Sequence, residues 1–401
     1  MPVLMTPLAV TAYTATSAMG HGLAAQLDAL RHARSGLRRN DFSSAPLACW
    51  IGRVEGVEAV VLPAAQATWD CRNNQLAWLG LNQDDFLAHV RAARARYGAG
   101  RIALLLGTST ASIGATEDAY RRLDADGGLP DDMLRPAIHA PHSLAGFVTA
   151  ALGLEGPCLT ISTACSSSAK AFASAERMIH LGLVDAAVVG GVDTLCDSVL
   201  FGFNSLELVS PAPCRPFDMA RDGISIGEAA GFALLERVDA ASEAPRMLGY
   251  GESSDAHHMS TPHPDGLGAE LALRDALARA GLDARHVDYI NLHGTASQKN
   301  DEVEAALVNR AFLTRTRASS TKGFTGHTLG AAGIVEATIA LQAIEHGLIP
   351  GNLGGLTPDP VCGASFAWRN EQQRVDVALS NSFGFGGNNA CLAFARAGFA
   401  A

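Results

Sequence analysis

Five short apolar runs, each bounded by Gly or Asp, alternate with segments of helical periodicity along this chain. The runs have the length and composition of buried strands, and they cover residues 101–107, 158–162, 185–190, 287–292 and 375–380. Helical patterns cover residues 168–181 and 333–346. Because strands that alternate with helices are typical of βαβ units, the pattern predicts an α/β fold around a mainly parallel sheet.

The composition fits a large packed core. Of the 401 residues, 48% are hydrophobic and 17% are charged, which excludes a disordered chain. Aromatic residues are scarce at 6%, whereas the 41 glycines favour tight turns between closely packed elements. No Pro/Ser-rich linker or charge block separates domains, so we expect one compact body with a long insertion in its middle.

Charge and cysteine content narrow the function classes further. Forty acidic against thirty basic residues give a net charge of -10, which argues against nucleic acid as a partner. The N-terminus lacks a basic segment followed by an apolar run, and the apolar stretches are too short to span a membrane. We therefore expect a cytoplasmic protein with no membrane partner. Its eight cysteines are expected to be core residues with one reactive thiol, rather than a disulfide framework or a zinc site.

A weak internal repeat indicates two related halves. In the first, a strand, TACSSS, a helix and the strand AAVVGG follow one another. In the second, the order is SSTKGFTGH, a helix and the strand VDVALSNS. We expect two similar α/β halves, residues 1–245 with an insertion and residues 246–401, which pack as one unit and divide near the loop at residues 241–246.

Cys165 is the candidate nucleophile. It lies between an apolar strand and an Ala-rich helix, in LTISTACSSSAKAF. A thiol at a helix N-terminus meets free backbone N–H groups and the positive end of the helix dipole, which lower its pKa. The alternative is a buried small hydrophobic residue, which is the usual state of a cysteine.

Two histidines are candidates for the same site. His293 follows the predicted strand YINL directly, at the end of a strand where α/β folds place their sites, and His327 lies in the Gly-rich segment STKGFTGHTLGAAG. Either could instead be a satisfied structural histidine. Lys322 and Glu336 lie near His327 in the sequence, and could be a surface lysine and a helix-face glutamate. A glutamate on so apolar a helix needs a partner if it is buried.

The glycine-rich segment NSFGFGGNNA at residues 381–390 follows a predicted strand. Its four glycines allow a ligand or another chain segment to approach the backbone closely. Neither GxGxxG nor GxxxxGK[ST] occurs there, which disfavours a nucleotide site.

Four blocks in a fixed order make the chain similar to one known family. They are TACSSS, RPFDMARDGISIGEAAG from Arg215, HGTAS and KGFTGHTLGAAG, and NSFGFGG follows them. With these blocks the chain resembles the β-ketoacyl-ACP synthase family, in its KAS I/II-like branch of the thiolase superfamily, over nearly its whole length. The resemblance implies a thiolase-like fold, in which two similar βαβ halves form a layered α-β-α-β-α body. It also implies decarboxylative condensation of malonyl-ACP with a cysteine-bound acyl chain in fatty-acid or polyketide synthesis.

The resemblance assigns catalytic roles residue by residue. Cys165 matches the nucleophile that takes the acyl chain, and His293 and His327 match the pair that promotes decarboxylation and stabilises the enolate oxygen. Lys322 matches the lysine that supports the second histidine, and Glu336 the glutamate of its network. In the glycine-rich segment, Phe385 matches the gating phenylalanine, and its backbone N–H would complete an oxyanion hole with that of Cys165.

Further residues are implied to bind substrate. Thr295 and Ser297 match positions that hydrogen-bond the phosphopantetheine arm, where the family commonly has Thr at both; Phe383 is placed beside them. The turn GTSTASIG at residues 107–114 replaces a turn of small residues near the acyl pocket. We expect its first two hydroxyls to cap the next helix and Thr110 to be a pocket residue, a pattern similar to synthases of specialised, aryl-polyene-type pathways. The segment at residues 255–266 resembles the loop at the tunnel mouth.

The residue patterns alone leave several other functions possible. A non-catalytic chain-length factor lacks the nucleophilic cysteine, which this chain retains. A thiolase would use a second cysteine near the glycine-rich loop, where Cys391 is the candidate, and the chalcone-synthase and initiation-synthase branches use Cys-His-Asn. A Cys/His hydrolase would leave one histidine and the Thr295–Ser297 pair unexplained, and a scaffold would leave all of them idle.

Partners and cofactors are also implied. The expected partner is an acidic acyl carrier protein, which brings its own phosphopantetheine, so that neither a metal nor a redox cofactor is needed. An acidic synthase must then concentrate positive charge at its entrance. The candidates are Arg91, Arg94 and Arg96, or Arg310, Arg315 and Arg317. The family also implies a homodimer through the strand after Cys158, or a heterodimer with a related subunit.

Overall fold

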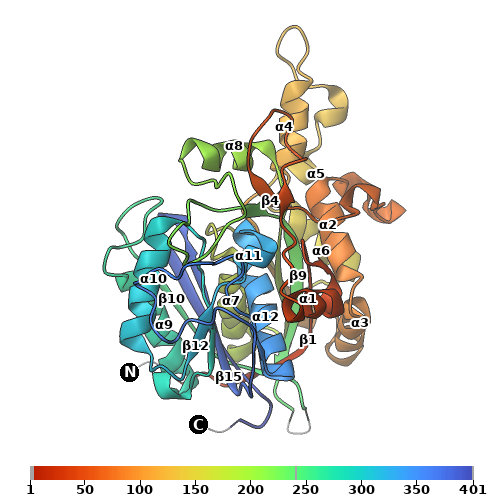
Figure 1. The fold of residues 1–401 in the computed structure, drawn as a ribbon. Coiled ribbons are helices and arrows are strands. Elements are labelled where there is room, and N and C mark those ends of the chain that lie inside the picture. The colour runs from red at the N-terminus through yellow and green to blue at the C-terminus, as the bar shows by residue number, and fades with distance from the viewer. Residues whose placement is uncertain (1–3, 240–241, 400–401) are drawn as a thin grey trace.

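The computed structural model describes residues 4–239 and 242–399 and contains one large mixed sheet (Figure 1). Its strand order is β12-β11-β15-β16-β10-β1-β9-β7-β5-β6, and β2 (Gly20–His21) pairs with β1. The bounds of the ten main strands are β1 Leu8–Ser17, β5 Ile102–Gly107, β6 Cys158–Ile161, β7 Ala186–Asp193, β9 Ala229–Arg237, β10 Arg246–Ser254, β11 Tyr289–Asn291, β12 Arg317–Ser319, β15 Val377–Gly384 and β16 Asn388–Ala395. Small sheets are formed by β3 (Arg38–Arg39), β4 (Trp50–Gly52) and β8 (Ile226–Gly227), and by β13 (Leu348–Ile349) and β14 (Glu371–Gln372).

The two ends of this sheet repeat one pattern. In one half, β5 pairs in parallel with β6 and β7, and β9 and β1 follow as antiparallel neighbours. In the other, β11 pairs in parallel with β12 and β15, and β16 and β10 follow as antiparallel neighbours. The halves meet where β1 pairs with β10. This repeat confirms two similar βαβ halves; the boundary between residues 245 and 246 stays a prediction, and Ala241 of the loop proposed there lies outside the described residues.

The prediction of a mainly parallel sheet is wrong. Only the outer strands of each half pair in parallel, whereas the six strands from β15 to β7 across the centre pair antiparallel. Strands buried on both faces read as apolar runs whatever their direction, so their sequence carries little information about pairing. The sequence patterns also did not separate β1, β9, β10 and β16 from their surroundings.

The described residues contain twelve α-helices, and those that cover the two halves of the sheet lie in three layers. Their bounds are α1 Gly22–Arg31, α2 Arg72–Leu81, α3 Phe86–Tyr97, α4 Ile113–Arg121, α5 Pro136–His139, α6 Ser143–Leu152, α7 Ser167–His180, α8 Asp197–Ser205, α9 Leu267–Ala280, α10 Gln298–Ala311, α11 Lys322–Thr325 and α12 Ala332–His346.

Side-chain alternation along the strands identifies the layers. Ala103 and Leu105 of β5 pack in the same core as α7 and α12, whereas Leu104 and Leu106 pack with α2, α3 and α6 on the other face. In the second half, alternate residues of β15 and β16 face the α7 and α12 core or the outer helices α9 and α10. The predicted α-β-α-β-α body is therefore confirmed, with α7 and α12 as its central layer.

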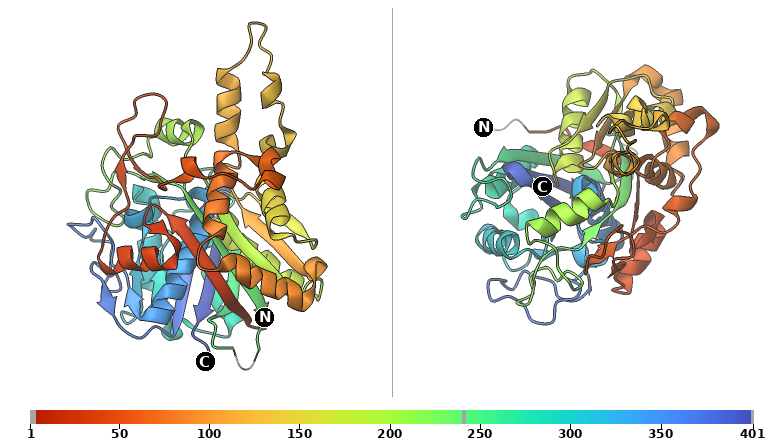
Figure 2. Two further views of the ribbon diagram at one scale, coloured as in Figure 1. Left: turned by 90° about the vertical axis from the view of Figure 1, so that its right-hand side faces the viewer. Right: turned by 90° about the horizontal axis from the view of Figure 1, so that it is seen from above.

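The central layer explains the composition of its helices. Helix α12 is buried over all but its last two residues, and a helix that is apolar all round belongs inside a protein. By contrast, α4, α5 and their connection rise away from the body (Figures 1 and 2). No helix in the described parts of the chain is long and apolar enough to cross a membrane.

Candidate active site

Cys165 lies in the sharp turn between β6 and α7. The next residue, Ser166, is the N-cap of α7, and the preceding residue, Ala164, has a left-handed backbone with φ of 52°. Such a conformation is strained for a residue with a side chain and recurs at functional sites. The side chain is nearly buried, at 5% exposure. The turn therefore places a thiol at the N-terminal end of a helix, as the sequence predicts.

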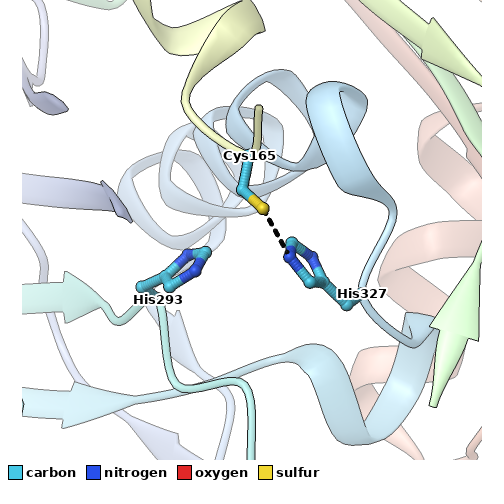
Figure 3. A group of neighbouring side chains, drawn as sticks. All are labelled: Cys165, His293 and His327. Atoms are coloured by element: carbon cyan, nitrogen blue, oxygen red, sulfur yellow. Dashed lines mark hydrogen bonds between the residues drawn. The ribbon is translucent and has the colours of Figure 1, made fainter. Parts of the chain in front are cut away.

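Both predicted histidines contact this thiol region (Figure 3). The Sγ of Cys165 lies 2.9 Å from Nε2 of His327. The rings of His293 and His327 lie 5.3 Å apart, nearly perpendicular to each other. His293 follows β11 after one residue, and the backbone of His327 is held between Ser225 and Gly227 by two hydrogen bonds. Residues separated by up to 162 positions thus form one cluster.

Burial decides the charge state of this cluster. It raises the pKa of the Cys165 thiol to about 12, although the charge of Lys322 and the backbone N–H of Phe385 oppose the shift. Burial therefore outweighs the lowering of this pKa that the helix N-terminus is expected to give. Burial, followed by the charge of Lys322, holds the pKa of both His293 and His327 well below the usual value. At neutral pH the 2.9 Å contact therefore joins a protonated thiol and a neutral imidazole, and the S–H donates to Nε2 in the His327 tautomer whose N–H is at Nδ1.

A buried ion pair supports the first histidine. The ammonium group of Lys322 donates to a carboxylate oxygen of Glu336 and to the backbone carbonyl of His293. Its Nζ also lies 3.5 Å from Nδ1 of His293. The direct contacts of Lys322 are thus with His293. The resemblance implied that Lys322 supports His327, and this assignment is wrong. An ammonium beside Nδ1 favours the tautomer whose N–H is at Nε2, the other ring nitrogen.

Glu304 is a site residue that the sequence patterns did not reveal. Its carboxylate accepts hydrogen bonds from the backbone N–H groups of His293, at 2.9 Å, and Gly294, at 2.7 Å. Asn381 donates to the same carboxylate from the glycine-rich segment. Burial raises the pKa of Glu304 to about 7. The only sequence signal for Glu304 is that an acidic residue lies on the buried face of α10. That signal can be recognised only once the structure shows which face of α10 is buried.

A cavity of ≈ 400 Å³ opens onto the cluster. Cys165, His293 and His327 line it together with Phe385, which the resemblance places among the catalytic residues, and with three predicted substrate residues, Thr295, Ser297 and Phe383. The hydroxyls of Thr295 and Ser297 lie 2.9 Å apart, so that a polar arm can meet both. Residues 258–262 of the predicted mouth loop also line the cavity.

The glycine-rich segment forms the wall beside the thiol. The ring of Phe385 stacks on Phe203 of α8 at 5.5 Å, and the backbone N–H of Gly386 donates to the carbonyl of Met259 at 2.7 Å. Gly386 and Gly387 have φ of 76° and 73°, which only glycine adopts without strain. These contacts place the N–H of Phe385 against the thiol, and they join the wall to the mouth loop.

Thr110 is not a pocket residue. Its hydroxyl and its backbone N–H both donate to the carboxylate of Asp193 at 2.7 Å, and it does not line the cavity. The hydroxyl of Thr108 binds the same carboxylate, so it does not cap α4 either. The turn at residues 107–112 is therefore organised by Asp193, a residue that the sequence analysis did not single out.

Neither arginine group lines the cavity, but Arg310 donates to the backbone carbonyl of Asp265 in the mouth loop, so the prediction that one group rims the entrance stays a prediction. Arg310, Arg315 and Arg317 pair with acidic side chains, and none of the six arginines lines the cavity. Among the described residues that do line it, Lys299 is the only lysine or arginine, and it is exposed and paired with Glu302.

One group in the described parts of the chain has metal-ligand geometry. The ligand atoms of Cys165, His293 and His327 all lie within 4.8 Å of one another, a donor set that suits zinc. A metal there would take the thiol away from His327, and the ammonium of Lys322 beside His293 opposes a further cation. The residues fit a nucleophile with two imidazoles better than a metal centre.

Comparisons with known proteins agree with this geometry. The models of the β-ketoacyl synthase N-terminal and C-terminal domains match residues 74–241 and 245–355. Nodulation protein E of Rhizobium meliloti is 34% identical over 360 residues, which cover 85% of this chain and 89% of that protein. The mitochondrial 3-oxoacyl-[acyl-carrier-protein] synthase of Arabidopsis thaliana is 39% identical over 271 residues, which cover 63% of this chain and 59% of that protein.

A solved structure is similar over almost the full length. It is the ketosynthase ApeO in complex with its chain length factor ApeC from Xenorhabdus doucetiae, with a TM-score of 0.89, 36% identity and 98% coverage of both chains. The two domain models, these relatives and the cysteine–histidine cluster agree with one another. The chain belongs to the β-ketoacyl synthase family.

Proposed function

We propose that this chain is a 3-oxoacyl-[acyl-carrier-protein] synthase, an acyltransferase that extends an acyl chain by two carbons. One observation carries the proposal. The thiol of Cys165 contacts His327, faces His293, and opens onto a cavity whose walls include the hydroxyls of Thr295 and Ser297. Those groups are what a thioester exchange followed by a decarboxylative condensation requires.

In the first half-reaction, Cys165 takes the acyl group from its carrier. As the sulfur attacks the thioester carbonyl, Nε2 of His327 accepts the thiol proton, so that no free thiolate has to exist beforehand. The oxyanion forms beside the backbone N–H of Phe385. When it collapses, the bond to the phosphopantetheine sulfur breaks and the leaving thiolate takes from His327 the proton that Cys165 gave up, so that His327 is neutral again and the acyl group remains as a thioester on Cys165.

In the second half-reaction, malonyl thioester loses carbon dioxide. The carbon–carbon bond breaks, its electron pair forms an enolate, and the N–H donors of His293 and His327 stabilise the enolate oxygen. Because burial keeps both rings neutral, each has one N–H, and Lys322 favours the N–H of His293 at Nε2. Once Cys165 is acylated, Nε2 of His327 has no thiol proton to accept, and the tautomer with its N–H at Nε2 is the one that donates to the enolate oxygen. The enolate carbon then attacks the acyl carbonyl and the new carbon–carbon bond forms. The carbon–sulfur bond to Cys165 breaks, and the Cys165 thiolate takes up one proton from solvent, which restores the thiol.

Two other activities fit less well. A thiolase would need a second reactive cysteine, but Cys391 is fully buried in the core between β16 and α9 and does not line the cavity. A chain-length factor would have no use for the Cys165–His327 contact. The proposed steps balance all atoms and charges without a metal or a redox cofactor, so we retain the proposal that none is required.

The partners follow from the proposed chemistry. We propose that an acyl carrier protein delivers both substrates and that the synthase works as a dimer. Strand β6 supports this because it is an edge of the sheet, and Leu159 is 41% exposed there. The ApeO–ApeC complex supports a related subunit as the second member, and a second copy of this chain is the other arrangement; light scattering of the protein alone distinguishes them. A cytoplasmic location and a specialised, aryl-polyene-type pathway stay predictions.

Cys165→Ala and Cys391→Ala form a matched pair to test the function. With acyl-ACP and malonyl-ACP, Cys165→Ala should form no acyl-enzyme by intact mass spectrometry and no β-ketoacyl product, yet it should still release carbon dioxide from malonyl-ACP. Cys391→Ala should keep both half-reactions. Undiminished condensation by Cys165→Ala would refute the nucleophile, and loss of activity in a folded Cys391→Ala would favour the thiolase alternative.

A further inference from the structure

Asp193 is a buried carboxylate that is saturated with hydrogen bonds. It ends β7 and is 0% exposed. Its oxygens accept from the hydroxyls of Thr108 and Thr110 and from the backbone N–H groups of Ser109, Thr110 and Gly330, at 2.6–3.0 Å. Buried carboxylates are usually paired with a cation, whereas the partners found for Asp193 among the described residues are these hydroxyl and backbone N–H groups.

The groups that bind Asp193 come from two segments of the active site. Thr108, Ser109 and Thr110 form the turn after β5, and the hydroxyl of Ser109 donates to the carbonyl of Ala164, the residue just before the nucleophile. Gly330 lies three residues after His327 and donates to Asp193 at 2.6 Å. One carboxylate therefore connects the neighbour of Cys165 with the loop that carries His327.

The junction has little room to adjust. A Cβ on Gly330 would lie 2.8 Å from an oxygen of Asp193 and 2.8 Å from the hydroxyl of Ser109. A Cβ on Gly191, two residues before Asp193, would lie 2.7 Å from Ser168 at the start of α7. Such tight contacts transmit a change in one segment to the others.

Electrostatics does not explain why a carboxylate is present. A negative charge near the thiol disfavours the thiolate, and Asp193 raises the pKa of Cys165. If the charge of Asp193 were its only contribution, Asp193 would only make the Cys165 thiol a weaker nucleophile. The hydrogen bonds, by contrast, fix the two segments between which the 2.9 Å contact from Cys165 to His327 is formed.

We propose that Asp193 is a positioning residue for the condensation, which sets the separation between Cys165 and His327 through the turn at residues 108–110 and through Gly330. This inference deepens the proposed function and rests on it. It also explains the hydroxyl-rich turn, because two of its hydroxyls are donors to the carboxylate rather than walls of the acyl pocket.

The substitution Asp193→Asn tests the proposal, because asparagine has the shape of aspartate but carries an NH2 donor in place of one acceptor oxygen. We expect kcat for condensation to fall about 10²-fold, the scale of a misplaced reacting group, with KM little changed. The same variant should react with iodoacetamide at Cys165 at least as fast as wild type, because the opposing charge is gone. Because a loosened structure would also expose the thiol and speed its alkylation, the fall in kcat supports the proposal only if Asp193→Asn unfolds at the same denaturant concentration as wild type.

Asp288→Asn is the matched control. Asp288 accepts two backbone N–H groups, of Asp376 and Val377, at the opposite ends of β11 and β15. It should keep the wild-type kcat and alkylation rate. The proposal is overturned if Asp193→Asn condenses within twofold of wild type, or if Asp288→Asn loses as much.

Thr110→Val provides a second variant if Asp193→Asn does not fold. It removes one donor from Asp193 and should lower kcat roughly three- to tenfold at unchanged KM, and an unchanged kcat would overturn the proposal. If wild type itself does not condense acyl-ACP with malonyl-ACP, the proposed function fails. If wild type condenses and Asp193→Asn condenses equally fast, the proposed function stands and only the positioning role fails.

Discussion

The sulfur of Cys165 and Nε2 of His327 lie 2.9 Å apart at the floor of a cavity, and neither residue is more than 5% exposed. In this setting the pair exists as a neutral thiol and a neutral imidazole rather than as an ion pair. Burial opposes charge on both groups, and the nearby charge of Lys322 opposes a proton on the histidine. The thiol thus becomes a nucleophile only as it attacks, by passing its proton to His327.

The neutral pair predicts a particular pH dependence of alkylation. Because the pKa of Cys165 is raised to about 12, its reaction with iodoacetamide should accelerate nearly tenfold per pH unit from pH 7 to pH 10, without a plateau. Mass spectrometry of the peptide that contains Cys165 follows this residue alone, and Cys165→Ala supplies the blank. A plateau below pH 8 would mean that the thiolate is already formed.

For the Lys322–Glu336 ion pair we expect that removing both charges restores the stability of the protein but not its condensation activity. Lys322→Met leaves a buried carboxylate without its partner and should destabilise the protein by about 3–5 kcal/mol in denaturant titrations. Lys322→Met/Glu336→Gln removes both charges and should recover most of that loss. Condensation should stay low in both variants, because His293 has lost the ammonium at its carbonyl and at Nδ1. Recovery of activity in the double variant would show that the pair is only structural.

Glu304 predicts an unusual dependence of stability on pH. Its pKa is raised from 4.5 to about 7 in the folded protein, so the folded state binds more protons than the unfolded state between those values. The stabilising effect of this group is complete below pH 4.5 and is lost as pH rises through about 7. Relative to Glu304→Gln, wild type should therefore lose about 1–3 kcal/mol of unfolding free energy between pH 5 and pH 8. A difference that does not change with pH would contradict the raised pKa.

From the position of Lys299 we expect an acidic carrier protein to bind at this side of the cavity entrance. Lys299→Glu should raise the KM for carrier-bound substrates several-fold, most clearly at low salt, because it reverses the one lysine or arginine charge among the described lining residues. The KM for small thioester substrates should not change. Arg91→Glu, at an exposed arginine away from the cavity, is the control and should leave both values as they are. An unchanged KM for Lys299→Glu would remove it from the docking surface.

The parts of the site that the sequence predicted are those marked by local motifs. Cys165, His293 and His327 each lie in a short segment whose position after a strand already indicates a site. The role of Thr110 could not be predicted, because its hydroxyl is directed by Asp193, 83 residues away. For the same reason the partner of Lys322 was assigned to the wrong histidine, since a side chain that reaches 29 positions along the sequence leaves no local signal.

Prediction of the fold is limited in the same way, because local patterns do not reveal partners that lie far apart in the sequence. The periodicity identified β5, β6, β7, β11 and β15, because each is a short apolar run between turns. It did not identify the antiparallel strands between the two halves, whose partners lie far apart in the sequence, as with β1 and β9. The layered body therefore followed from the family resemblance, whereas the direction of the central strands needed the structure.

Trapping the acyl-enzyme tests directly whether Cys165 carries the acyl chain during condensation. Wild-type protein is incubated with acyl-ACP, mapped by mass spectrometry, and then mixed with malonyl-ACP. The thioester should be found on Cys165 alone and should disappear at the rate at which the β-ketoacyl product and carbon dioxide form. An acyl group on another residue, or a Cys165 thioester that persists while product accumulates, would contradict the account.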